Sequence, residues 1–234
     1  MSSPLRNTAL QALQGEKYFR WRGGDVSRLE GITDAVIALA MTLLIVSLEM
    51  PESFDQLVGN FRQLPAFAVC FLLLGMIWQY HFRFHRRFGL ENGVVIALNS
   101  ALLFLILFYV YPLKYLFTEL FDMFLFGERP DLGSGGELMV IYSSGVVGIF
   151  LLFLAMNAYA YRRRDVLELD EVERILTRAA VREHGIHVVI GLASIGLALA
   201  GQPALAGLVY FLVGPSAGFH GWLTGRAVRR AAAE

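Results

Sequence analysis

The stretch that decides the fold is RLEGITDAVIALAMTLLIVSLEMP, which runs from Arg28 to Pro51. Charges bound it at Arg28 and Glu49, so as a helix it would measure roughly 32 Å at about 1.5 Å per residue. That length is close to the roughly 30 Å of a bilayer core. Asp34 lies inside the stretch, and an ionisable group within a spanning helix normally faces a protein interior or a water path. The stretch therefore predicts a membrane-spanning helix and marks the place to look for function.

The composition of the rest of the chain agrees with a membrane protein. Of the 234 residues, 56% are hydrophobic and only 17% are charged, and the charges fall in short clusters between long apolar runs. This pattern is typical of a protein that crosses the bilayer several times. The net charge is zero and no nucleic-acid-binding motif is present, so we expect no nucleic-acid partner.

The apolar runs predict an all-α, polytopic membrane protein. The first four runs are clear, whereas the fifth is short and glycine-rich, and only the turn signal GQP at 201–203 separates it from the sixth. A single re-entrant segment is the alternative there. The six expected spans cover residues 29–49, 64–84, 93–116, 138–161, 185–200 and 203–224.

The basic residues predict how the chain lies in the membrane. Of the 20 Lys and Arg residues, all but Arg62, Lys114 and Arg129 fall on one side of the expected spans. The positive-inside rule then places both termini in the cytoplasm of a multi-pass cell-membrane protein. We expect a cytosolic N-terminal tail without a signal peptide, a six-helix membrane domain and a cytosolic C-terminal tail, at residues 1–27, 28–225 and 226–234.

The connection between the fourth and fifth spans, about 165–184, is expected to be an amphipathic cytosolic helix. Asp170 and Glu173 are spaced as a capping box, in which each side chain accepts a hydrogen bond from the backbone of the other. Apolar residues then follow at helical spacing.

One face of the first span carries an apolar stripe. Ile32, Leu39 and Val46 recur every seven residues, and Thr42 and Leu43 lie on the same face. Such a stripe suits a helix packed against copies of itself, and rings of these side chains could gate a pore by dewetting. Periodicity alone favours a simple packing seam, because most membrane helices carry an apolar stripe.

Polar residues from three spans are expected at a similar depth. Asp34 comes from the first span, Trp78 and His81 from the second, and Asn99 from the third. These side chains could satisfy one another's hydrogen bonds. A structural network that holds the spans together is the favoured interpretation, and a proton-sensitive or ion-attracting vestibule is the alternative.

The sequence offers little support for an enzyme or a metal site. No nucleophile–base arrangement or phosphate-binding glycine loop is present. His184 and His187 could share a metal ion by spacing, but no third ligand is obvious, so we expect a solvated or interfacial pair. The TVGYG carbonyl filter of many potassium channels is also absent.

The first span resembles the first helix of the transmembrane protein 175 family, which comprises lysosomal potassium channels and bacterial relatives. The family signature is an arginine, then Phe-Ser-Asp-Gly, then an apolar Thr-Leu-Leu helix. Trp78 with His81 resembles the family's motif on the second helix, and Asn99 and Pro112 fit its third-helix pattern. The first-helix residues that match are Arg28, Asp34, Ala38, Thr42, Leu43 and Leu44.

The resemblance implies a bacterial-type homotetramer with six helices per subunit, a pore lined by the four first helices, and no cofactor. Potassium would permeate with modest preference over sodium. Leu39 would form the narrowest ring, Leu43 and Val46 the next layers, and Thr42 would supply hydroxyls. The inter-helix network would consist of Arg28, Asp34, Trp78, His81 and Asn99. Two further hypotheses remain: a proton-coupled or other secondary transporter that uses Asp34, and a non-conducting scaffold.

Overall fold

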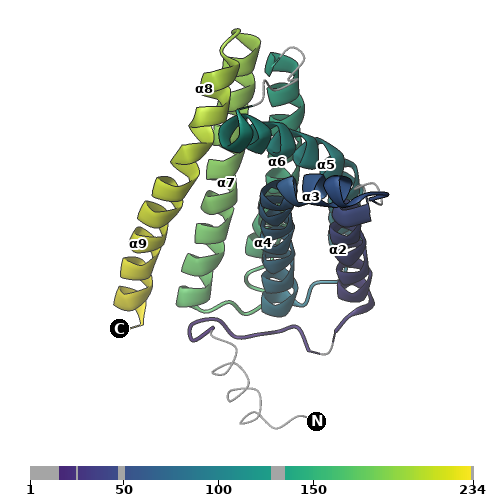
Figure 1. Ribbon diagram of the computed structural model, residues 1–234. Coiled ribbons are helices and arrows are strands. Elements are labelled where there is room, and N and C mark those ends of the chain that lie inside the picture. Colours follow the sequence, from purple (N-terminus) through teal and green to yellow (C-terminus); the bar gives the residue numbers. More distant parts are fainter. Residues whose placement is uncertain (1–15, 25, 47–50, 128–134, 233–234) are drawn as a thin grey trace.

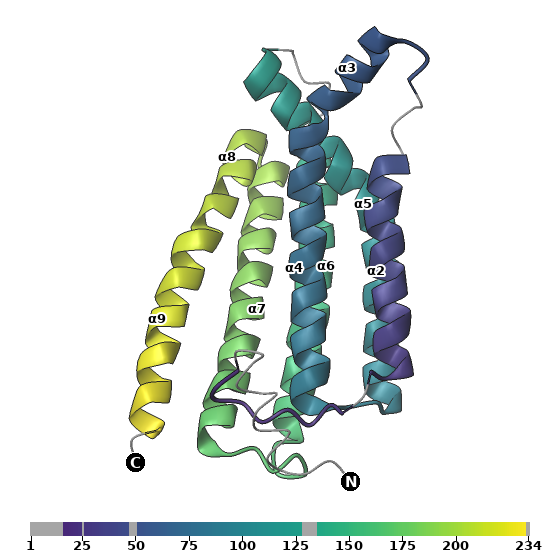
Figure 2. The ribbon, with the colours of Figure 1, turned by 60° about the horizontal axis from the view of Figure 1, so that its bottom comes forward.

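The computed structural model describes residues 16–24, 26–46, 51–127 and 135–232, and every regular element within these ranges is helical. The long helices run antiparallel to their neighbours in sequence and form an upright bundle (Figures 1 and 2). The elements are α2 (Arg28–Val46), α3 (Phe54–Arg62), α4 (Leu64–Phe88), α5 (Gly93–Phe126), α6 (Gly135–Arg162), α7 (Glu171–Leu199), α8 (Pro203–Leu208), the short 3-10 helix η1 (Val209–Leu212) and α9 (Val213–Ala231).

The two ends of the bundle differ in charge. One end, called the basic end here, holds the start of α2, the end of α4 and the end of α9, together with the connection from α6 to α7 (Figure 2). Its arginines include Arg86, Arg163 and Arg229. This arrangement agrees with the charge asymmetry expected from the sequence.

Five of the described helical segments are long and apolar enough to cross a membrane: α2, α4, α5, α6 and the segment from α8 to α9. The helix α7 does not meet that criterion by composition, yet it packs along α6 and runs parallel to the bundle axis. The chain is therefore an all-helical, multi-pass membrane protein.

The fifth expected span differs from the sequence-based prediction. The capping box of Asp170 and Glu173 is present, but the helix that it starts runs without a break from Glu171 to Leu199. The expected cytosolic helix at about 165–184 and the expected fifth span are thus one helix, because nothing between them breaks it. The turn predicted at GQP is present, since α7 ends at Leu199, Gly201 has a φ of 75°, and α8 begins at Pro203.

The helix α5 extends well beyond the expected third span. It continues to Phe126 and ends at Gly127, whose φ of 68° suits a helix C-cap. Pro112 lies inside the helix and removes one backbone hydrogen bond. The C-terminal part of α5 runs across the upper part of the bundle in Figure 1. The same end carries α3, a short helix that the sequence reasoning did not predict, capped by Ser53.

The core lies where α2, α4, α5 and α6 meet. Its fully buried side chains include Leu44, Leu74, Leu102 and Phe153, one from each of these helices. In contrast, the segment from α8 to α9 packs mainly against α7 and leaves most of its surface exposed. That exposed surface is apolar, as expected for a helix that borders lipid.

Candidate functional site

The helix α2 has a buried face and an exposed face, and the apolar stripe lies on the exposed one. Ile37, Ala40 and Leu44 are buried against α4 and α5. Leu39 and Val46 lie on the opposite side of the helix and are 51% and 67% exposed. Leu39 and Val46 are therefore not used for packing within the subunit.

Ile32 is likewise exposed, and the two remaining stripe residues, Thr42 and Leu43, lie at the edges of the stripe. Thr42 is exposed, and its hydroxyl donates to the carbonyl oxygen of Ala38 at 2.8 Å. That bond leaves the oxygen's lone pairs free to accept hydrogen bonds from the exposed side. Leu43 is half-buried and packs partly against the core.

A buried polar chain joins α2, α4 and α5. Asn99 is fully buried on α5 and donates to the hydroxyl of Thr33 on α2 at 3.0 Å. The Asn99 amide oxygen is 2.9 Å from Nε2 of His81 on α4. The Thr33 hydroxyl also lies 2.9 Å from the carbonyl oxygen of Leu29. These contacts connect three helices through one buried amide.

A second polar contact lies on the exposed side of the same helices. The indole N–H of Trp78 donates to Oδ1 of Asp34 at 2.8 Å, and the Trp78 ring stacks on Phe82. Four of the five residues expected to form one network thus fall into two separate groups. The fifth, Arg28, is exposed at the first position of α2 and belongs to neither group. Thr33, which the expected network did not include, is the residue through which α2 joins the buried group.

The segment of residues 16–24, expected to be part of a tail, lies against the basic end as a strap. It crosses beneath α4 toward the start of α7 (Figure 2). Phe19 is buried and meets the ring of Phe88 edge-on at 5.6 Å between centroids. Gly23 lies so close to α4 that an added Cβ would be 2.6 Å from the carbonyl oxygen of His85. Only glycine allows this approach of the two backbones.

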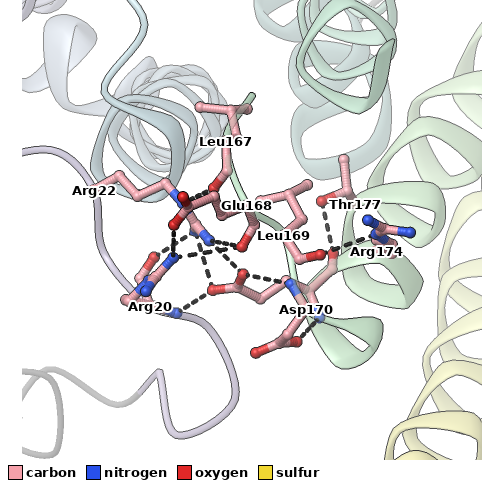
Figure 3. A network of polar contacts seen from close by, with 9 residues as sticks. Arg20, Arg22, Leu167, Glu168, Leu169, Asp170, Arg174 and Thr177 are labelled. Carbon is pink, nitrogen blue, oxygen red and sulfur yellow. Dashed lines mark hydrogen bonds and ion pairs between the residues drawn. The ribbon is translucent and has the colours of Figure 1, made fainter. Parts of the chain in front are cut away.

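The strap is anchored to α7 by Glu173 (Figure 3). Arg22 forms a two-pronged ion pair with this carboxylate, with Nη1 3.0 Å from Oε1. The backbone N–H of Arg20 donates to the same oxygen at 2.7 Å. Because Glu173 also accepts from the backbone N–H of Asp170, one buried carboxylate holds both the strap and the start of α7.

The other end of the strap reaches the first turn of α2. Arg86 on α4 donates to the carbonyl oxygen of Gly24 at 2.6 Å and lies 3.6 Å from the carboxylate of Glu30. Glu30 in turn forms a capping box with Ser27, which starts α2. The strap therefore links the start of the exposed-stripe helix to both α4 and α7.

The chain is similar to known potassium channels. The family model described as "Endosomal/lysosomal potassium channel TMEM175" matches residues 28–109, which include the stripe and both polar groups. A potassium channel of Marivirga tractuosa is 35% identical over 229 residues, which cover 91% of this chain and 93% of the relative. The chain belongs to the TMEM175 family.

One solved structure supports this assignment, and two further proteins are similar over part of the chain or in fold alone. A crystal structure of a variant of the potassium channel MtTMEM175 superposes with a TM-score of 0.80 at 33% identity, covering 90% of this chain and 98% of that chain. The TMEM175 homologue of Chamaesiphon minutus shares the fold, with a TM-score of 0.50 at 18% identity over 80% of this chain and 96% of that chain. A potassium channel of Chryseobacterium is 29% identical over 33% of this chain and 41% of the relative.

The histidine pair on α7 has a different environment from the one expected. His184 and His187 are buried rather than solvated, and the His187 ring stacks on Phe150 at 4.0 Å between centroids. Nδ1 of His187 is 2.8 Å from the carbonyl oxygen of Glu183. Within the described residues, no group of three His, Cys, Asp or Glu side chains is placed to hold a metal ion. The rings fill the contact between α6 and α7.

We expect Asn99→Leu to destabilise this TMEM175 family member. The substitution leaves the His81 ring without its buried partner, and an unsatisfied buried group costs about 1–3 kcal/mol. The Thr33 hydroxyl loses its link to α5 but keeps its bond to the carbonyl oxygen of Leu29. Thermal unfolding in detergent would measure the loss. Ser100→Leu is the control, because Ser100 is exposed and bonds only within its own helix. Equal unfolding temperatures for the two variants would contradict a stabilising role for the buried chain.

Proposed function

We propose that the chain forms a homotetrameric, potassium-permeable cation channel in which the four α2 helices surround the pore. The observation that carries the proposal is the position of Leu39. It lies about 16 Å along the helix from Arg28 at 1.5 Å per residue, near the middle of a bilayer. Its side chain is half-exposed on the side of α2 opposite the subunit's own core. Membership of a family of potassium channels supports the same assignment.

Three further copies of the chain are the proposed partners of this exposed stripe. In such an assembly Leu39 would form the narrowest ring, with Leu43 and Val46 in the next layers and Thr42 hydroxyls near the constriction. A ring of apolar side chains resists wetting, so it can both gate the pore and bias which hydrated ions pass. Permeant monovalent cations need no bound cofactor in this scheme.

The orientation follows from the basic end. Charge asymmetry favours a cytoplasmic location for that end, and with it for both termini, in the bacterial cell membrane. The buried Thr33–Asn99–His81 chain would then support α2 on its cytoplasmic half, and the Asp34–Trp78 pair would lie at the exposed side of the same level.

The geometry of α2 argues against the alternative of a secondary transporter that uses Asp34. Transporters bind their substrates at broken helices near the midplane. The helix α2 continues unbroken through Asp34 from Arg28 to Val46. The Asp34 carboxylate already accepts a hydrogen bond from Trp78, as expected for a positioning contact between helices. A non-enzymatic, conducting role is therefore preferred.

The test is ion flux through the purified protein in liposomes of defined lipid, together with its mass in detergent. We expect a tetramer that releases trapped potassium at channel rates and faster than trapped sodium, with no saturation as the ion concentration rises. Slow, saturable flux would favour a transporter. Flux at the level of empty liposomes would favour a scaffold, and a monomeric mass would contradict the shared pore.

A further inference from the structure

A cavity of about 410 Å³ opens at the basic end between α4, α7 and α9. The strap borders it through Tyr18, and α6 contributes Asn157. This volume is within the range of pockets that hold small organic ligands. The cavity, called the α9 pocket here, lies between the outer helices of the bundle and contains no residue of the α2 stripe.

The charges around the α9 pocket favour an anion. Arg83 from α4 and Arg229 from α9 line it, and neither side chain has an ion-pair partner within the described part of the chain. Arg87 also lines it but is held by Glu16, with Nη2 2.9 Å from Oε1. The one carboxylate in the lining, Glu183, accepts a hydrogen bond from the hydroxyl of Tyr80 at 2.7 Å. The positive charge of the Arg83 and Arg229 guanidinium groups therefore exceeds the negative charge of the one carboxylate in the lining.

Two imidazole nitrogens in the lining lack partners. His184 is only 2% exposed, and its Nδ1 has no hydrogen-bond partner in the described residues. Nε2 of His220, on α9, is likewise buried without one. Buried polar atoms in folded proteins are nearly always satisfied. A ligand with several oxygen acceptors would satisfy both nitrogens, together with the hydroxyl of Thr224.

The outer surface of α9 places the α9 pocket near the membrane interface. Phe219, Trp222 and Leu223 are exposed on the same helix turns that line it. Arg226 lies over the Trp222 ring at 4.6 Å. Tryptophan beside arginine is typical of the level of the lipid headgroups. Basic pockets between helices at this level hold phosphate-bearing headgroups.

We propose that the α9 pocket binds a phosphate group that carries a net negative charge, held by Arg83 and Arg229. The phosphate of an anionic lipid and free phosphate in solution share this chemistry. The phosphate of phosphatidylcholine carries the same charge, but its choline cation makes the headgroup neutral overall and would be repelled by the arginines, so we expect it to bind more weakly. The proposal does not depend on ion conduction, so a failed flux experiment would leave it standing.

For the test, the protein is exchanged into vesicles of either phosphatidylglycerol or phosphatidylcholine. Native mass spectrometry then counts the lipid molecules that stay bound to it. We expect the wild type to retain phosphatidylglycerol and not phosphatidylcholine. Each of Arg83→Gln and Arg229→Gln should weaken retention roughly fivefold, which corresponds to about 1 kcal/mol per basic residue at an anionic membrane surface. Arg230→Gln is the matched control, because Arg230 is the exposed neighbour outside the lining.

A second arm separates the two phosphate sources. Inorganic phosphate is added in phosphatidylcholine vesicles, and the thermal unfolding temperature is followed for all variants. An arginine-dependent increase without retained phosphatidylglycerol would identify free phosphate as the ligand and support the site. If Arg83→Gln and Arg229→Gln both behave like the wild type in both arms, as the control Arg230→Gln should, the proposal is overturned. The unliganded unfolding temperature of each variant shows whether it is folded.

Discussion

Leu39→Ala should raise sodium flux through the reconstituted protein severalfold and reduce its preference for potassium. The substitution removes most of the side chain that would form the narrowest ring, so the constriction widens and the cost of wetting it falls. Ions could then pass with more of their hydration shell. Because Leu39 is exposed in the subunit, the change should alter the free energy of unfolding by no more than about 0.5 kcal/mol. Liposome flux assays with potassium and sodium gradients would measure it.

The matched control for this prediction is Leu192→Ala. Leu192 lies on α7, away from α2, and is 53% exposed, compared with 51% for Leu39. The same atoms are lost from a similarly exposed position, so flux and selectivity should match the wild type. Unchanged conductance and selectivity in Leu39→Ala would show that the stripe does not line the conducting path.

Glu173→Gln should produce the largest loss of stability, about 3 kcal/mol. Removing one member of a buried ion pair leaves the other charge without compensation, and Arg22 is largely buried in the contact shown in Figure 3. The glutamine keeps the shape of the side chain and can still accept one backbone hydrogen bond. Denaturant or thermal unfolding in detergent would measure the change. Glu171→Gln, an exposed change on the same turn of α7, is the control.

The same contact predicts a dependence on pH. Burial by itself raises the pKa of the Glu173 carboxyl, but the hydrogen bonds from Arg22, Arg20 and Asp170 outweigh it and hold that pKa below its ordinary value of 4.5. A lowered pKa in the folded state means that the contact stabilises the protein above about pH 4.3, the pKa of an unfolded glutamate, and loses its contribution as the pH falls further. The wild type should therefore lose stability below that pH more steeply than Glu173→Gln. Parallel curves would contradict this role of the anchor.

The parts of the fold that follow from local pattern could be predicted from the sequence. Apolar runs of the right length gave the positions of α2, α4 and α6, and the residue types at Asp170 and Glu173 indicated where α7 begins. The separation between the buried and exposed faces of α2 also follows from its periodicity. What the stripe would contact in an assembly depends on the other subunits, so periodicity alone favoured a simple packing seam over a pore lining.

The parts that depend on contacts between distant residues were missed. The strap has no apolar run, so it looked like a tail, and its only signals are Phe19, Trp21 and the adjacent glycines among charged residues. Thr33 has no local sign of its role, because its partner Asn99 lies on another helix. Similar depth suggested one group of Asp34, Trp78, His81 and Asn99, but depth does not give the direction in which each side chain points, and the hydrogen bonds divide these residues into two groups.

The anchor of the strap lies 151 residues after Arg22 in the chain. During synthesis the ribosome makes α2, α4, α5 and α6 before it reaches Glu173, so the contacts of the strap with α4 can form while its anchor on α7 does not yet exist. The strap is therefore held at both ends only when the start of α7 emerges. Protection of the strap from protease should thus be complete only in chains that extend past Glu173, which would distinguish shorter incomplete products from mature subunits.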